Sequence, residues 1–117
     1  MSAGNQELSI QQNATFQFSV ILKDPAGAPV DLTGASVKME IRNEPDGTLF
    51  ETLSTVSGEI TIPIPTNGQM DFELPPARTA ALDFATGVYD VLVTFPTGTT
   101  PRILQGLCTL SRGVTEL

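Results

Sequence analysis

The sequence has no histidine, so its chemistry would have to come from carboxylates, one tyrosine and one cysteine. The absence of histidine excludes the Ser-His-Asp and Cys-His mechanisms and removes the commonest zinc ligand. Cys108 stands in an apolar segment without a basic cluster that would lower its pKa, which predicts a small buried hydrophobe. One cysteine gives no intrachain disulfide and no cysteine-rich metal site.

The carboxylates do not have the spacing of a catalytic or metal site. Asp71 and Glu73 are two residues apart in a predicted strand, so they project from the same face. A glycosidase needs carboxylates on opposite sides of a bound sugar. The loop carboxylates Asp24 and Asp46 lack the regular spacing of a calcium-binding loop. We therefore predict no enzymatic activity, no cofactor and no metal.

Two short motifs are predicted to fix turns and corners. In the run from Asp31 to Gly34, the aspartate can bond the backbone ahead and the glycine can adopt a positive φ. The alternative is a loop displayed to a partner. Tyr89 is predicted to pack its ring inside and to bond a nearby backbone group through its hydroxyl, with ligand stacking as the alternative. Asp90 has apolar neighbours and, if buried, must be satisfied by backbone N–H groups.

The elements that position these residues are predicted to be strands. Turn signals rich in glycine and proline recur about every 10 to 20 residues, which is typical of an all-β sandwich or barrel. Between them, apolar and polar residues alternate, as in antiparallel sheets with one buried face. The alternating segments are 16–22, 37–42, 49–53, 60–64, 70–74 and 89–95. Residues 75–82, with prolines first and alanines after, predict one short connector helix.

Two strands have unusual patterns. Pro63 and Pro65 lack the N–H that a ladder needs, so the segment from Ile60 to Ile64 is predicted to be an edge strand. The segment 102–110 is apolar on both faces, so it is either central in the sandwich or covered by a partner chain. The candidate partner contacts in these two segments are Ile60, Ile62, Ile64, Ile103, Leu104, Leu107 and Leu110.

Length and charge limit the classes of function. With 117 residues and 12.4 kDa, the chain is predicted to be one domain over 6–117, preceded by a flexible tail over 1–5. The net charge of −7 and the scattered basic residues argue against binding to nucleic acid or to a membrane surface. The sequence has no apolar run that could span a membrane and no secretory signal, which predicts synthesis in a cytosol.

The order of the motifs resembles that of small tailed-bacteriophage and prophage virion proteins with an immunoglobulin-like sandwich. The N-terminal domain of phage baseplate upper proteins is one relative. The segments that carry the resemblance are 16–22, 24–34, 37–42, 68–72, 87–91, 102–106 and 114–115.

This resemblance implies an immunoglobulin-like antiparallel β-sandwich of seven or eight strands and a structural, non-enzymatic role. The chain would then be a virion subunit of the tail, baseplate or fibre-attachment region, made in the host cytoplasm. It would bridge other virion proteins and form a homo-oligomer in the assembled particle. A capsid decoration protein and a carbohydrate-binding module for the host surface are the alternatives.

Overall fold

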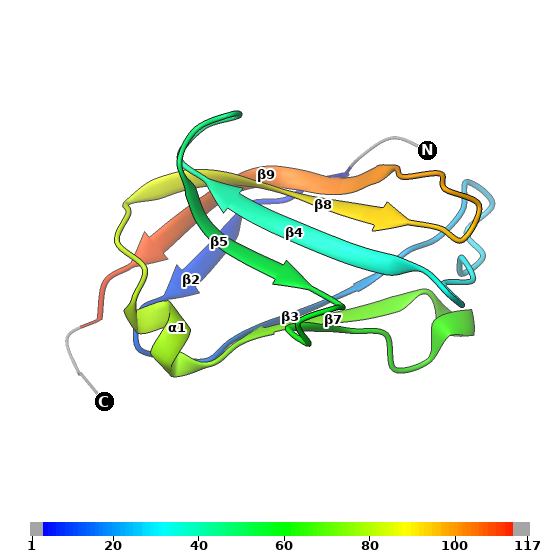
Figure 1. Cartoon of the computed structure of the whole chain (residues 1–117), viewed down its shortest axis with the longest axis horizontal. Coiled ribbons are helices and arrows are strands. Elements are labelled where there is room, and N and C mark those ends of the chain that lie inside the picture. Colours follow the sequence, from blue (N-terminus) through cyan, green and yellow to red (C-terminus); the bar gives the residue numbers. More distant parts are fainter. Residues whose placement is uncertain (1–3, 114–117) are drawn as a thin grey trace.

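The chain forms a sandwich of two facing β-sheets with one short helix (Figure 1). The computed structural model describes residues 4–113. The large sheet has the order β1-β9-β8-β4-β5, with β2 also paired to β9, and the small sheet has the order β3-β7-β6. The large sheet contains β1 (Gly4–Asn5), β2 (Leu8–Gln11), β4 (Ser36–Arg42), β5 (Leu49–Ser54), β8 (Thr86–Thr94) and β9 (Arg102–Ser111). The small sheet contains β3 (Phe16–Ile21), β6 (Ile60–Thr61) and β7 (Gln69–Leu74).

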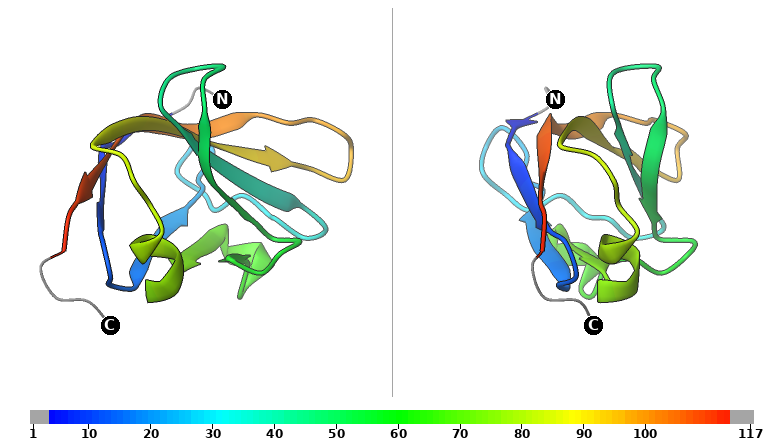
Figure 2. Two further views of the ribbon diagram at one scale, coloured as in Figure 1. Left: turned by 60° about the vertical axis from the view of Figure 1, so that its left-hand side comes forward. Right: turned by 90° about the vertical axis from the view of Figure 1, so that its left-hand side faces the viewer.

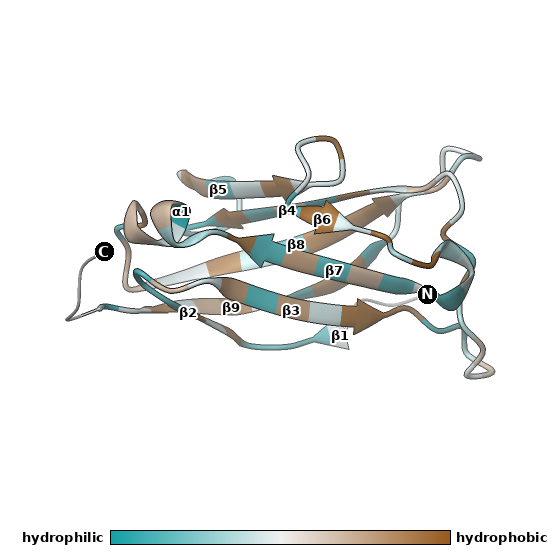
Figure 3. Cartoon of the chain, turned by 90° about the horizontal axis from the view of Figure 1, so that it is seen from below, coloured by the Kyte–Doolittle hydropathy of each residue, from teal (hydrophilic) through white to brown (hydrophobic). Residues whose placement is uncertain are grey.

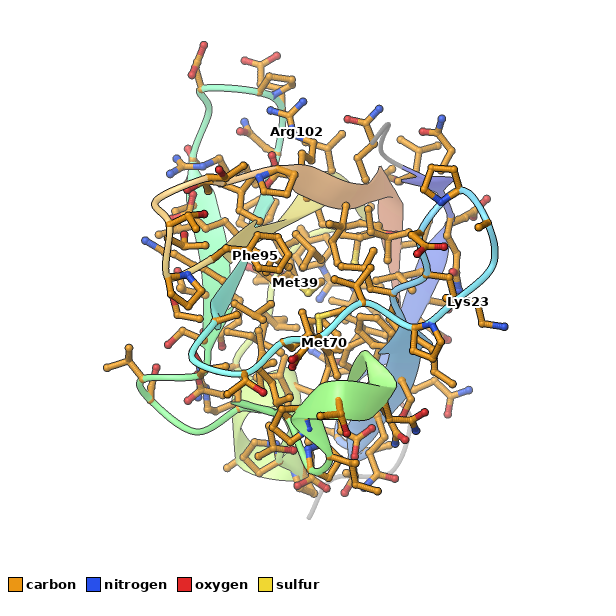
Figure 4. The ribbon with its side chains drawn as sticks, turned by 90° about the vertical axis from the view of Figure 1, so that its right-hand side faces the viewer. Lys23, Met39, Met70, Phe95 and Arg102 are labelled. Carbon is orange, nitrogen blue, oxygen red and sulfur yellow. The ribbon has the colours of Figure 1, made fainter. Side chains whose placement is uncertain are left out.

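The core lies between the sheets and is built by residues at alternate positions. On β4, Val37, Met39 and Ile41 are buried, and the residues between them face outward. Met39 of the large sheet and Met70 of the small sheet lie in the middle of the core (Figure 4). The two sheets confirm the prediction of an all-β sandwich, and β4 has the one buried face that its alternating pattern predicts.

The N-terminal strand pair was not predicted. β1 and β2 run parallel to β9, with Gly4 opposite Leu104 and Leu8 opposite Cys108. The tail predicted for residues 1–5 is therefore wrong for Gly4 and Asn5, while residues 1–3 lie outside the described part of the chain. With β1 and β2, residues 4–113 contain nine strands, whereas seven or eight were predicted.

β6 is shorter than the sequence pattern predicts. It ends at Thr61, and a 3₁₀ helix covers Pro65–Asn67. The prolines at 63 and 65 have no N–H for a ladder, so pairing with β7 stops before them. Gly68 follows with φ 72°, and a Cβ there would lie 2.5 Å from the Leu22 carbonyl oxygen. β6 does lie at the edge of the small sheet, as predicted.

The connector helix is α1 (Pro76–Ala80), and it links the two sheets along one flank (Figure 2). Its Arg78 bonds two carboxylates, at 2.9 Å to Glu59 Oε2 and at 2.5 Å to Glu51 Oε1. Glu51 lies on β5 of the large sheet, whereas Glu59 directly precedes β6 of the small sheet. The buried Thr79 hydroxyl donates a 2.8 Å hydrogen bond to the Ala14 carbonyl. The helix therefore holds together segments that are far apart in the sequence.

Candidate interaction surface

The outward side chains of the three central strands of the large sheet form one continuous surface, which we call the outer face. The register places these side chains beside one another, because each pairs across the ladder with another outward residue. The outer face consists of Lys38, Glu40 and Arg42 on β4, Val88, Asp90 and Leu92 on β8, and Arg102, Gln105 and Leu107 on β9.

An open depression of about 810 Å³ lies on the outer face. Val88, Gly106 and Leu107 supply apolar lining, and the side chain of Leu107 is 50% exposed. Asn5 of β1 and the loop after β4, through Pro45 and Asp46, complete the lining. The surface is therefore an apolar centre with a polar surround.

Ion pairs surround this apolar centre. Arg102 Nε lies 3.0 Å from Asp90 Oδ2, and Arg42 Nη2 lies 3.0 Å from Glu40 Oε1. Lys38 Nζ is 3.6 Å from the other oxygen of Glu40. The three cations and two anions give the outer face a net charge of +1, in a chain whose net charge is −7. This surface is therefore much less acidic than the rest of the protein.

The loop between β4 and β5 forms a wall of the depression and is held by its own hydrogen bonds. Arg42 Nη1 donates to the Gly47 carbonyl at 2.9 Å, and the Gly47 N–H donates to the Glu44 carbonyl at 2.9 Å. The Asn43 N–H donates to the Thr48 carbonyl at 3.1 Å. Because Arg42 bonds both this loop and Glu40, the wall and the sheet surface are fixed relative to each other.

Comparisons with known proteins identify the fold. No protein-family model and no curated protein matches the sequence. The crystal structure of a strand-swapped dimer of the immunoglobulin-like domain of mouse leukocyte-associated immunoglobulin-like receptor 1 is similar, with a TM-score of 0.50 and 21% identity. The match covers 90% of this chain and 88% of that chain.

The fold is immunoglobulin-like. Drosophila OTK, extracellular domains 3–5, also matches, with a TM-score of 0.40 and 13% identity over 93% of this chain and 33% of that one.

Within the immunoglobulin-like sandwich, most of the predicted partner contacts lie in the chain's own core. Ile60, Ile103, Leu104 and Leu110 are buried, which corrects their assignment to a partner surface. The physical reason is that these side chains point into the core between the two sheets, whereas the other face of β9, with Arg102, Gln105 and Leu107, belongs to the outer face. Exposed side chains remain at Ile64 and Leu107, and Ile62 is half-buried.

Tyr89 and Asp90 point to opposite sides of β8. The Tyr89 ring is buried, and its hydroxyl donates a 2.5 Å hydrogen bond to the Gln6 carbonyl, between β1 and β2. Burial raises the pKa of Tyr89 to about 12, and the nearby Cys108 contributes. Asp90 is half-buried and pairs with the Arg102 guanidinium, whereas backbone N–H partners were expected only for a buried Asp90.

The turn at 31–34 has the side-chain bonding that its residue types favour. Asp31 Oδ1 accepts hydrogen bonds from the Thr33 hydroxyl at 2.6 Å and from the Thr33 N–H at 2.9 Å. These hydrogen bonds lower the pKa of the Asp31 carboxyl. Gly34 has φ 76° and lies close to Pro96, which ties this turn to the loop after β8.

The other carboxylates and the cysteine of the described chain, residues 4–113, form no metal site. No group of three or more His, Cys, Asp or Glu side chains there could hold a metal ion. In the same range, no helix is long and apolar enough to cross a membrane. Asp71 accepts hydrogen bonds from Gln69 at 2.9 Å and Ser19 at 2.7 Å, which lower the pKa of its carboxyl. Cys108 is buried, and burial raises its pKa to about 11.

The sequence did not predict that these outward residues form one surface. Its residues come from three strands, and only the register of β4, β8 and β9 brings Arg42, Asp90 and Leu107 together. Alternation indicates that Arg42 and Asp90 point outward, but it gives no direction for Leu107, because the segment 102–110 is apolar on both faces. Of the residues on the outer face, only the exposed Leu107 is among the partner contacts predicted from the sequence.

Proposed function

We propose that this chain is a non-enzymatic structural subunit that binds a neighbouring protein through the outer face of its large sheet. The observation that carries the proposal is the open depression, where the half-exposed Leu107 is surrounded by the ion pairs of Arg42 and Arg102. An apolar centre within a polar rim is typical of protein–protein interfaces. The near-neutral charge of this surface favours docking in an otherwise acidic protein.

The neighbouring proteins that we propose are those of a bacteriophage particle. Support for this comes from the resemblance of the motif order to virion proteins with an immunoglobulin-like sandwich. The tail, baseplate or fibre-attachment region is the proposed location, with capsid decoration as the alternative. The net charge of −7 would keep the free subunit soluble before assembly.

A carbohydrate-binding role has less support from the described residues. Sugar-binding surfaces commonly use an exposed aromatic ring, and the ring of Tyr89 is buried with its hydroxyl bonded to Gln6. The phenylalanines are buried or half-buried in the described chain. A protein partner is therefore the function that the geometry favours.

The first test asks whether the chain is part of a particle. Phage particles released from the strain that carries the gene are purified on a density gradient, and mass spectrometry measures this chain relative to the major tail and capsid proteins. We expect the chain at a constant ratio to tail proteins, in intact particles and in tails separated from capsids. Constant association with capsids alone would support the decoration alternative. Absence from purified particles would contradict the virion assignment.

The second test asks whether the outer face makes the contact. Leu107→Lys adds a charge at the centre of the depression, on a side chain that is already 50% exposed, so the fold should be kept. We expect at least a tenfold loss of incorporation into particles. Val56→Lys is the matched control, because it adds the same charge at a loop position that is 92% exposed. Equal incorporation of the two variants would show that the outer face is not the contact.

A further inference from the structure

β3 has one hydrogen-bonding edge that no described strand uses. It pairs with β7 alone, and the register continues to Leu22, whose N–H donates to the Gly68 carbonyl at 2.8 Å. In an antiparallel ladder the residues that bond the partner strand alternate with those that face away. The N–H and C=O groups of Gln17, Ser19 and Ile21 therefore point to the free edge. This edge offers bonding groups to an incoming strand.

The other edges of the sandwich are protected. On β5, Arg78 Nη2 donates to the Thr52 carbonyl at 3.1 Å, and Glu51 Oε1 accepts from the Thr52 N–H at 2.9 Å. Glu59 Oε1 accepts from the Ser54 N–H at 3.1 Å. β6 and β1 have two residues each and β2 has four, and short edges are a common protection against pairing. β3, with six residues, is the longest edge strand without such protection among the described residues.

Apolar side chains accompany the free edge of β3. Phe18 and Val20 point toward the core but are only half-buried, and the side chain of Ile21 is 50% exposed. Figure 3 shows the hydrophobic end of β3 at the side of the small sheet. A strand added here would cover these side chains and pair the free backbone groups at the same time.

A second copy of this chain fits this edge better than an arbitrary partner. Residues 16–21 contain no charged side chain, so pairing β3 with β3 places no like charges opposite each other across the new ladder. The carboxylates of Asp71 and Glu73 on the neighbouring β7 are hydrogen-bonded to Ser19 and Gln17. The segment is also compatible with itself. Antiparallel pairing centred on Ser19 would place Phe18 opposite Val20 of the second copy, and Gln17 opposite Ile21.

We infer that the free edge of β3 is a self-association site, at which β3 pairs with β3 of a second copy around a two-fold axis. The two small sheets then form one continuous sheet across the dimer. This contact is separate from the outer face of the large sheet. A dimer formed in this way leaves both outer faces open to other proteins.

A single proline substitution in β3 tests the inference. Ser19→Pro removes an N–H that faces the free edge, and edge strands tolerate proline where the N–H faces solvent. Ser19→Ala is the matched control, because both variants lose the hydroxyl bond to Asp71 but only the proline variant loses the N–H. Sedimentation equilibrium over a range of concentrations measures the dimer. We expect dimers for the wild type and Ser19→Ala, and a dissociation constant at least about tenfold higher for Ser19→Pro, because two edge hydrogen bonds are lost.

A second pair of variants covers the case in which Ser19→Pro does not fold. Gln17→Lys/Ile21→Lys places like charges opposite each other across the proposed pairing, at two exposed positions. Val56→Lys/Thr86→Lys adds the same charge at two exposed positions, one in the loop after β5 and one on β8. We expect only the first double variant to be monomeric. A wild type that is monomeric at every concentration, or equal dimerisation of the two double variants, would overturn the inference.

Discussion

The hydroxyl of Tyr89 is a single group that fixes the N-terminal segment to the large sheet. Its acceptor, the Gln6 carbonyl, lies between β1 and β2, and the Gln6 N–H donates to the Gln105 carbonyl at 3.0 Å. We expect Tyr89→Phe to lower the free energy of unfolding by about 1–2 kcal/mol, because the hydrogen bond between the buried tyrosine and the Gln6 carbonyl is lost. Urea denaturation measures this change.

The control for this prediction is Thr86→Ala, which removes an exposed hydroxyl from the same strand. It should change the free energy of unfolding by less than about 0.5 kcal/mol. If Tyr89→Phe has an equally small effect, the hydroxyl does not stabilise the N-terminal segment.

Residue types predict part of this local bonding. The place of Tyr89 at the start of a strand near the C-terminal end of the sequence predicts a corner residue whose hydroxyl bonds the backbone. Nothing in the sequence identifies the Gln6 carbonyl, 83 residues away, as the acceptor. Asp90 shows the same limit. Its partner Arg102 lies on β9, and the pairing depends on an irregularity in the register between β8 and β9.

The link between α1 and the edges of the two sheets depends on Arg78. Its guanidinium bonds Glu51, Glu59 and the Thr52 carbonyl. Burial raises the pKa of Glu59, but hydrogen bonds from Arg78, the Ser54 N–H and Ser57, together with the charge of Arg78, lower it by more. We expect Arg78→Ala to lower the free energy of unfolding at pH 7 by about 1–3 kcal/mol, as both carboxylates lose their cation.

The pH dependence of this effect follows from the lowered pKa of Glu59. The ion pair stabilises the folded chain at neutral pH, and its contribution is lost as the carboxylate becomes protonated. The difference between the wild type and Arg78→Ala should therefore shrink as the pH falls below 4.5, the usual pKa of a glutamate. Arg112→Ala, which breaks the exposed pair with Asp83, should cost less than about 0.5 kcal/mol. Equal losses in both variants would contradict a special role for Arg78.

Strand patterns predict most elements, and their failures have physical causes. Alternation over 37–42 and 70–74 gives β4 and β7, because these strands have one buried face. It fails for β1 and β2, whose two and four residues are too short for a clear period. For β6, the apolar alternation extends to Ile64, but proline chemistry ends the strand at Thr61.

The stability of the sandwich is expected to fall at alkaline pH. Burial raises the pKa of Cys108 from 9.0 to about 11, and that of Tyr89 from 10.0 to about 12. Both groups lose a proton more easily in the unfolded chain, so the free energy of unfolding should decrease between about pH 9 and pH 12. Urea denaturation at a series of pH values measures this decrease.

The variant Cys108→Ala separates the contributions of Cys108 and Tyr89 to the loss of stability at alkaline pH. The variant should lose the part of the decrease between about pH 9 and pH 11, and keep the later part that belongs to Tyr89. A profile that is flat from pH 9 to pH 12 in the wild type would show that neither group is held in its protonated form by folding.

The pairing of β2 with β9 has a consequence for protein synthesis. Leu8 pairs with Cys108, so β2 needs a partner strand that is synthesised about a hundred residues later. β9 also lies between β8 and the N-terminal strands, so the large sheet is incomplete until residue 111 has left the ribosome. β2 is therefore made before β3 to β8 but can pair only after them, once β9 has emerged.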